Sequence, residues 1–187
     1  MKRLFYLMVC SLLFALCAAA EENIQINALY AQNNIDKALD LLISVPEEKR
    51  TPQDYLLLGN ILQDKGKNGE AIFMYNRAIL ADKKYYKAYY NLGVIYLQEE
   101  KPNLAISQFK QVIKLNPEFA YAHFNLGCAY IKTGELKKAK NEFLRAIELK
   151  NTVPDFHYNL AYAYKKLNKE KSAKLYLGYY NKLMENQ

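Results

Sequence analysis

The sequence has few of the residues that catalysis or metal binding requires. Its 187 residues include two histidines, three cysteines and seven glycines. The segment Gly66-Lys67-Asn68-Gly69 matches neither the spacing of a dinucleotide-binding loop nor that of a P-loop. Carboxylates are scattered near lysines, as on solvated helix surfaces. We therefore predict no enzyme, no cofactor and no metal site.

The two histidines and the internal cysteine are better explained by packing than by chemistry. His123 and His157 are 34 positions apart and hold a place that Tyr55 and Tyr89 hold elsewhere, so both are expected to be packed aromatic substitutes. Cys128 has no histidine at the spacing that would activate a nucleophile on one helical face. We expect it to be a small apolar filler.

The first twenty residues have the pattern of a secretory signal peptide. Residues 1–3 are positively charged, residues 4–16 are apolar apart from one serine, and residues 18–20 are alanines. This order predicts export to the periplasm or the exterior, with cleavage before Glu21. An uncleaved segment would instead anchor the protein in a membrane, and a buried core helix is the remaining alternative. Lipidation is not expected, because large residues precede Cys10 and Cys17.

Cleavage would change the bulk properties of the chain. It would remove Cys10 and Cys17 and leave Cys128 alone, so no internal disulfide could form and stability would depend on packing. The formal net charge would fall from +7 to +5, because Lys2 and Arg3 are lost. The remaining length suits one domain with a continuous core.

A period of 34 positions organises the rest of the sequence. Four columns of residues repeat at this step: Leu58, Leu92, Leu126 and Leu160; Gly59, Gly93, Gly127 and Ala161; Leu62, Tyr96, Tyr130 and Tyr164; and Ala71, Ala105, Ala139 and Ala173. Within one period, residues 88–117 show two apolar stripes at intervals of three and four, separated by Lys101-Pro102-Asn103. Each period is therefore expected to be a pair of amphipathic helices.

The pattern resembles the tetratricopeptide repeat, a helix-turn-helix unit with this same period. Within residues 86–119, the residues that match the family pattern are Tyr89, Leu92-Gly93, Tyr96, Ala105, Phe109 and Pro117. The resemblance implies an all-α fold, a right-handed superhelical solenoid of such repeats. Gly93 and Ala105 are expected where helix backbones approach too closely for larger side chains.

Extending the frame in both directions gives the domain organisation. Four repeats are predicted at 52–85, 86–119, 120–153 and 154–187, after the signal peptide of 1–20. Residues 21–51 are predicted to form a degenerate N-terminal repeat and a linker, since terminal repeats are usually atypical. The last helix, near residues 170–184, is richly apolar, and those side chains belong either to the core or to the face of a homodimer.

In the family that the sequence resembles, first helices line a concave groove that binds a protein or an extended peptide. Asn91, Asn125 and Asn159 fall at the sixth position of three first helices. A primary amide can pair with the backbone of any peptide, and the column resembles the asparagine ladder in the repeat domain of O-linked N-acetylglucosamine transferase. The alternative is that each asparagine hydrogen-bonds the backbone of the adjacent repeat, which demands the same chemistry.

Other predicted groove residues lie beside this column: Asn60, Tyr90, Tyr121, Phe124, Tyr158, Lys132, Lys165 and Lys166. Residues 21–131 carry a balance of −1 and residues 132–187 a balance of +6. An acidic partner or an anionic membrane surface could use this charge, although a solvated lysine face is the commoner cause. Nucleic acid is not expected, because of the export signal and the lack of clustered arginines.

A second mode known in the family, the carboxylate clamp for chaperone C-termini, is not expected. Asn60 and Asn91 match two of its positions, but Leu56, Tyr121 and Asn125 stand where basic residues are required. The sequence therefore predicts a non-enzymatic scaffold of the cell envelope or exterior that binds a protein in its groove. The alternative is a structural module that self-associates through the C-terminal helix.

Overall fold

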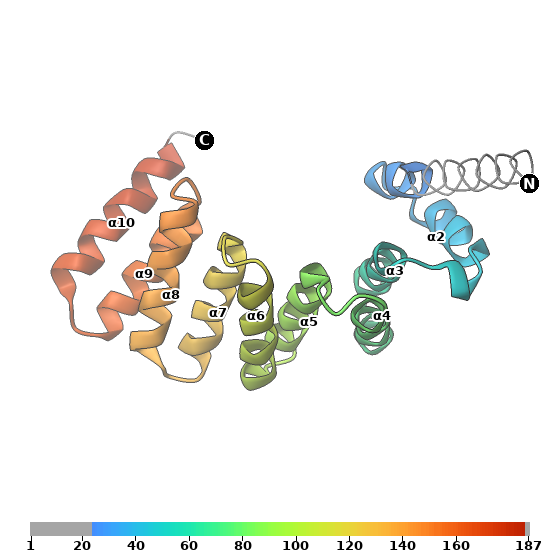
Figure 1. Cartoon of the computed structure of the whole chain (residues 1–187). Coiled ribbons are helices and arrows are strands. Elements are labelled where there is room, and N and C mark those ends of the chain that lie inside the picture. Colours follow the sequence, from blue (N-terminus) through green and yellow to red (C-terminus); the bar gives the residue numbers. More distant parts are fainter. Residues whose placement is uncertain (1–23, 186–187) are drawn as a thin grey trace, which may run out of the picture. The chain divides into compact units, whose positions relative to one another are not determined.

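The computed structural model describes residues 24–185, and every regular element in this range is a helix (Figure 1). The predicted signal peptide of residues 1–20 lies outside the described residues. Packing contacts divide the chain after Met74, and we describe the two parts separately. Among residues 24–185, no helix is long and apolar enough to cross a membrane.

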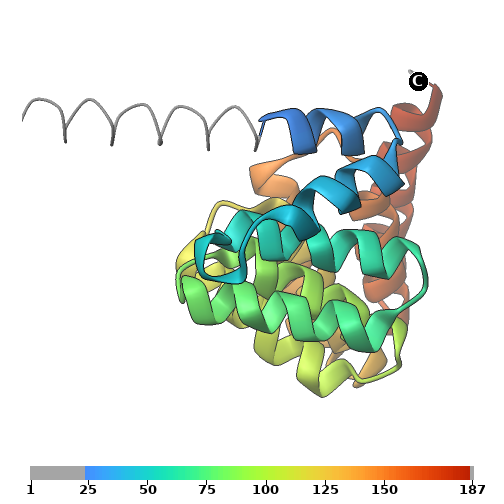
Figure 2. The same cartoon turned by 90° about the vertical axis from the view of Figure 1, so that its right-hand side faces the viewer.

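The first part contains residues 24–31, which are helical, followed by α2 (Ile35–Ser44), the 3-10 turn η1 (Glu47–Lys49) and α3 (Pro52–Asp64). Figure 2 shows residues 24–31 and α2 as neighbouring helices joined by a short turn. Ile26 of the first helix and Leu42 of α2 are both buried. The Tyr30 hydroxyl donates to the Asp64 carboxylate at 2.7 Å and so ties the first helix to α3.

The start of α3 is fixed by a reciprocal cap. The Asp54 carboxylate accepts from the backbone N–H of Thr51 at 2.7 Å, and the Thr51 hydroxyl accepts from the backbone N–H of Asp54 at 3.3 Å. Pro52 follows in the first turn, where its missing N–H would have had no partner. This capping box satisfies backbone donors that a helix N-terminus otherwise leaves unpaired.

The second part stacks helical hairpins. Helix α4 (Asn68–Ala81) begins in the first part and ends in the second. The hairpins that follow are α5 (Tyr86–Gln98) with α6 (Pro102–Leu115), α7 (Ala120–Lys132) with α8 (Leu136–Leu149), and α9 (Pro154–Lys166) with α10 (Glu170–Glu185). Helix α6 also packs on α7, and α8 on α9, so each hairpin is held by the next.

The core of this stack lies between the paired helices. It includes two close contacts, Gly93 with Phe109 and Gly127 with Phe143. Phe109 and Phe143 are fully buried. A Cβ added to Gly93 would lie 2.6 Å from the Phe109 ring, and the atoms nearest to it all belong to that side chain. The prediction of a close approach at Gly93 was therefore right in place but wrong in partner. The glycine makes room for an aromatic ring and not for a second backbone.

A residue with positive φ, in the left-handed region, lies at the same distance after each of these first helices. Gly66, Glu100, Gly134 and Asn168 have φ of +74°, +55°, +77° and +57°, and each comes two residues after the end of α3, α5, α7 or α9. These four residues are again spaced by the repeat step. This conformation reverses the chain into the second helix, and glycine adopts it without the steric cost that other residues incur.

Candidate partner-binding surface

The asparagine column makes hydrogen bonds within the protein. The Asn125 side-chain N–H donates to the Tyr90 hydroxyl at 3.0 Å, which links α7 to α5 of the preceding hairpin. The Asn159 side-chain N–H donates to the Asp155 carbonyl of its own helix at 2.9 Å. Asn91 is half-buried on α5. The Asn125 bond joins neighbouring hairpins, but it goes to a side-chain hydroxyl and not to the backbone that the structural interpretation names. A primary amide also carries a second N–H and a carbonyl oxygen. Both interpretations of the column therefore stay open.

The Tyr90 hydroxyl sits in a partly desolvated place. Burial raises the pKa of Tyr90, and the hydrogen bond from Asn125 opposes part of that rise. The hydroxyl is therefore neutral over the physiological range, and it can accept from Asn125 while it donates elsewhere. This makes the pair a polar point within an otherwise aromatic surface.

Three of the predicted aromatic residues, Tyr90, Tyr121 and Phe124, are joined into one row. The Tyr90 ring meets Phe119 edge-on, with centroids 5.0 Å apart, and Phe119 lies 6.0 Å from Tyr121. Tyr121 then meets Phe156 at 5.5 Å, and Phe124 stacks on Phe156 at 4.8 Å. Such edge-on and stacked pairs hold rings in place. The row therefore presents Tyr121, which is 36% exposed, on a rigid support.

The two phenylalanines that link this row were not among the predicted residues. Phe119 precedes α7, and Phe156 lies in the first turn of α9 and is fully buried. A signal was present for Phe119, because Tyr85, Phe119 and Val153 form an apolar column at the repeat step, whereas Phe156 takes the place of Ala88 and Ala122 in the earlier repeats. The column lies at the last position of each repeat, outside the helix stripes that the periodicity argument used.

A second group of predicted residues surrounds a cavity of about 290 Å³ between α9 and α10. Tyr158 is 50% exposed, and its ring lies 5.3 Å from that of Tyr180. Lys165 also lines this cavity, together with Tyr162, which is 40% exposed. Tyr162 is another residue that sequence analysis missed, although it holds the same repeat position as Asn60.

The predicted lysines have different surroundings. Lys132 forms an ion pair with Glu100 at 2.7 Å, and exposed pairs of this kind contribute little stability. The ammonium of Lys166 lies 5.5 Å from the centre of the Tyr162 ring. Lys150, which was not predicted, lies 5.1 Å from the centre of the Tyr121 ring. Cationic and aromatic groups are thus interleaved along this surface, in the arrangement that favours cation–π contacts.

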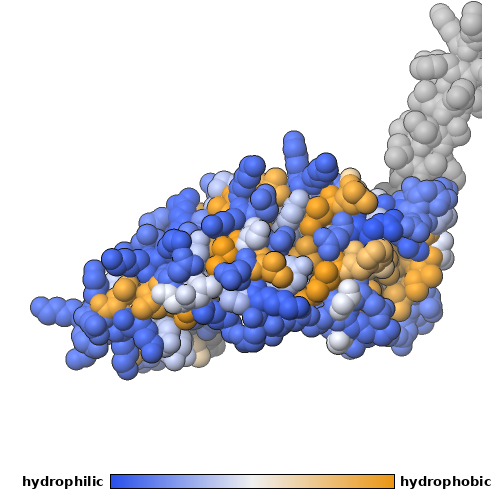
Figure 3. Space-filling view, turned by 90° about the horizontal axis from the view of Figure 1, so that it is seen from below, coloured by the Kyte–Doolittle hydropathy of each residue, from blue (hydrophilic) through white to orange (hydrophobic). Residues whose placement is uncertain are grey.

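Asn60 belongs to the first part of the chain, where it lies half-buried on α3. The other predicted residues all lie on α5, α7 and α9 in the second part. In the view of Figure 3, apolar side chains reach the surface in patches between hydrophilic ones. The candidate surface described by the aromatic row and the cavity at Tyr158 is therefore assigned to the second part alone.

The residues that were weighed for catalysis have little exposure. His123 and His157 are 7% and 5% exposed, and Cys128 is half-buried. Burial raises the pKa of the Cys128 thiol to about 12, and the negative charge of Asp155 adds to the rise. A protonated thiol is a poor nucleophile. Among the described residues, no group of three or more His, Cys, Asp or Glu side chains could hold a metal ion.

These observations define a stack of helical hairpins with a mixed aromatic, amide and lysine surface on its first helices. Family models of the tetratricopeptide repeat match residues 86–119 and 109–141, and a further TPR repeat model matches residues 59–100 and 127–168. Together they span residues 59–168, more than half of the chain. The chain is a tetratricopeptide-repeat protein, and the predicted all-α solenoid is confirmed.

Solved structures show the same fold. The structure of the MamA RS-1 ArsTM double mutant aligns with a TM-score of 0.79 and 19% identity, over 89% of this chain and 94% of that one. A crystal structure of MamA aligns with a TM-score of 0.77 and 23% identity, over 86% of this chain and 95% of that one. MamA 41-end from Desulfovibrio magneticus RS-1 aligns with a TM-score of 0.78 and 20% identity, over 89% of this chain and 94% of that one. No curated protein matches the sequence.

Proposed function

We propose that this protein is a non-enzymatic scaffold of the cell envelope or exterior, and that it binds a protein or an extended peptide on the surface of its first helices. One observation carries the proposal. Tyr121, Tyr158 and Tyr162 are 36%, 50% and 40% exposed on α7 and α9, where a monomer leaves much of each ring unpacked. Exposed aromatic side chains on a rigid support are typical of interfaces.

The surroundings of these tyrosines favour an acidic partner. Lys150 lies over Tyr121 and Lys166 lies over Tyr162, so the aromatic surface carries positive charge along its length. Lys165 and Lys174 line the cavity beside Tyr158 with one carboxylate, Glu170, so the balance of charge there is positive. A peptide with carboxylates between apolar side chains would satisfy both features. The contribution of the lysines would weaken as salt is added, because exposed charges are screened.

Export remains part of the proposal and rests on the composition of residues 1–20. Cell fractionation, with mass spectrometry of the N-terminus of the recovered protein, tests it. A chain that begins at Glu21 in the periplasm or the medium supports export. A chain that keeps residues 1–20 and sediments with membranes supports the anchored alternative, and a full-length chain in the cytosol contradicts both.

The partner surface is tested by crosslinking at single positions in the native cell. A photoreactive phenylalanine analogue replaces Tyr158 or Tyr121, and a matched control replaces Leu104, which is 47% exposed on the second helix α6. We expect a defined crosslinked protein from Tyr158 and Tyr121 but not from Leu104. The same products from all three positions, or products from Leu104 alone, would contradict the assignment of the surface.

A second candidate function, self-association through α10, has a specific observation in its favour. Leu175, Leu177, Tyr179 and Met184 are 54%, 42%, 46% and 47% exposed on this helix. Leu175 and Tyr179 are four residues apart and therefore share one helical face, and an exposed apolar pair of this kind is typical of an interface. In sedimentation, a dimer that dissociates when Leu175→Glu is introduced supports this function. A monomer at every concentration excludes it and leaves the first proposal intact.

A further inference from the structure

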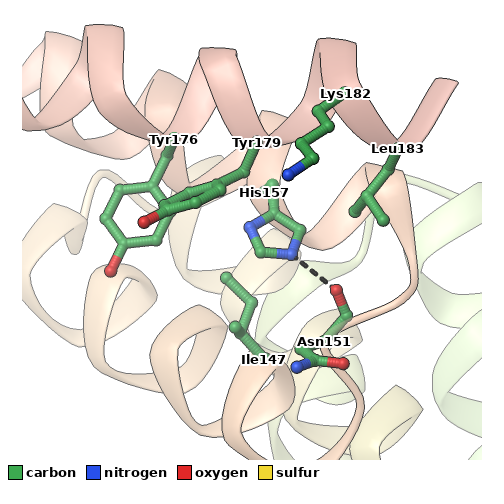
Figure 4. A pocket seen from close by; sticks show the side chains of 7 residues that line it. All are labelled: Ile147, Asn151, His157, Tyr176, Tyr179, Lys182 and Leu183. Atoms are coloured by element: carbon green, nitrogen blue, oxygen red, sulfur yellow. Dashed lines mark hydrogen bonds between the residues drawn. The ribbon is translucent and has the colours of Figure 1, made fainter. Parts of the chain in front are cut away.

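A cavity of about 410 Å³ lies between α9, α10 and the end of α8, and it contains none of the residues of the candidate partner surface (Figure 4). His157, Tyr176 and Tyr179 form one side, and Lys182 and Asn151 lie near its rim. A volume of this order is that of a small ligand site.

The imidazole of His157 is buried but only half satisfied. Its Nε2 lies 2.8 Å from the backbone carbonyl oxygen of Asn151, and a carbonyl oxygen only accepts, so Nε2 carries a hydrogen. Its Nδ1 is buried without a hydrogen-bond partner in the described structure. Leaving a buried polar atom unpaired costs free energy, so such atoms in native proteins call for an explanation.

The preceding repeat shows what this nitrogen lacks. His123, which holds the same position one repeat earlier, pairs its Nε2 with the backbone carbonyl of Pro117 at 3.0 Å, as His157 does with that of Asn151. The Nδ1 of His123, however, lies 2.8 Å from a carboxylate oxygen of Glu142. The residue one repeat after Glu142 is Tyr176, whose ring stacks on His157 at 6.1 Å. The repeat of His123 thus supplies a carboxylate for the histidine Nδ1, and the repeat of His157 has a tyrosine at that position.

We propose that this cavity binds a carboxylate from outside the chain, in the place that Glu142 fills for His123. As the carboxylate binds, Nδ1 of His157 takes up a proton from solvent and donates it in a charge-assisted hydrogen bond to one carboxylate oxygen. Lys182 also lines the cavity, and among the described residues that line it none is acidic. Because Nδ1 is buried, a ligand reaches it only when a covering ring moves, and Tyr179, centred 5.7 Å from the imidazole and 46% exposed, is more exposed than Tyr176.

Nitrogen-detected NMR of the histidine rings tests the proposal directly. The chain contains two histidines, so His123 serves as an internal control whose Nδ1 is already paired. The probe is N-acetylglutamate N-methylamide, and the matched control is the uncharged N-acetylglutamine N-methylamide. We expect the His157 Nδ1 signal to shift saturably with the probe, no shift at His123, and about tenfold weaker binding of the control.

Two variants separate a carboxylate site from a general apolar cavity. Tyr176→Glu places a carboxylate where the preceding repeat has Glu142, and it should abolish binding of the probe. Tyr176→Gln removes the same ring without supplying charge, and it should keep binding. The proposal is overturned if the His157 signal does not move in the native chain, if the glutamine analogue binds equally well, or if Tyr176→Glu binds like the native chain. The first two outcomes need no variant to fold.

Two further probes distinguish the source of the carboxylate. One is acetate and the other is the peptide acetyl-Glu-Glu-Glu-amide. Binding of the peptide at least about tenfold tighter than acetate indicates an acidic protein segment, and equal binding per carboxylate indicates a small free acid. Both results uphold the site. Failure of both probes to move His157 overturns it, whatever the crosslinking at Tyr158 shows.

Discussion

Phe143 covers Gly127 so closely that a Cβ added to the glycine would lie 2.5 Å from Cε1 of the ring. The two residues belong to α7 and α8 of one hairpin. In the last hairpin the same two positions hold Ala161 and Leu177, which line a common cavity. A larger residue at the small position is thus accompanied by a smaller residue on the facing helix.

This relationship predicts a coupled pair. Gly127→Ala should lower the free energy of unfolding by about 1–3 kcal/mol, because the fully buried Phe143 ring cannot move away without strain. Phe143→Leu alone should also destabilise, because it leaves a cavity. The double variant copies the last hairpin and should cost less than the sum of the two single changes, by about 0.5–3 kcal/mol.

Urea unfolding of the native chain, the two single variants and the double variant measures this coupling. Gly93→Ala is a second test of the same contact, since a Cβ there would lie 2.6 Å from Phe109. Additive free energies for Gly127 and Phe143 would show that the two residues do not constrain each other.

The sequence predicted the helical hairpins and their order, because a repeat column such as Gly59, Gly93 and Gly127 records equivalent places in successive units. It did not predict that Phe143 lies over Gly127. A period tells which residues are alike, but which residues meet depends on how two antiparallel helices are rotated and displaced. That rotation is set by the packing of whole side chains, and the repeat period of the sequence does not determine it.

The left-handed turns give a matched pair of glycine predictions. Gly134 has φ +77° and open space around its missing Cβ, so Gly134→Ala should destabilise by about 1 kcal/mol through backbone strain alone. Gly178 lies inside α10, also with open space, and Gly178→Ala should stabilise by about 0.5–1 kcal/mol. Thermal unfolding should shift in opposite directions. Shifts of the same sign would contradict the difference in backbone conformation.

Cys128 should be unreactive until the protein unfolds, because burial raises its pKa to about 12 and the thiolate is the reactive form. In a chain with Cys10→Ser and Cys17→Ser, a disulfide reagent at about pH 8 should label Cys128 quickly in denaturant and slowly without it. Fast labelling of the folded chain would contradict this.

The same shift has a pH dependence with a definite sign. The raised pKa means that the folded state holds the thiol proton more tightly than the unfolded state does. Its stabilising effect is present below the unfolded thiol pKa of about 8.5 and is lost as the pH rises toward about 12. Between these limits the native chain should lose stability more steeply than Cys128→Ala. Equal slopes would show that the thiol does not contribute.

The partner surface was predictable only in part. The amide column and the tyrosines on first helices follow from the repeat frame, as for Asn125 and Tyr158. The Asn125 bond to Tyr90 joins residues 35 apart, one more than the repeat step, so a column of equivalent positions does not reveal it. The frame places residues on a face, and side-chain rotamers then decide which of them pair with each other.

This pair allows the two interpretations of the asparagine column to be separated. Tyr90→Phe removes the hydroxyl that accepts from Asn125 and should lower stability by about 0.5–1.5 kcal/mol. Asn125→Ala removes the same bond and, in addition, every amide group that a partner could use. If Asn125 binds a partner, Asn125→Ala should reduce crosslinking at Tyr158 while Tyr90→Phe preserves it, because the freed amide still faces the partner. If the asparagine is purely structural, the two variants should lower stability equally and leave crosslinking equally unchanged.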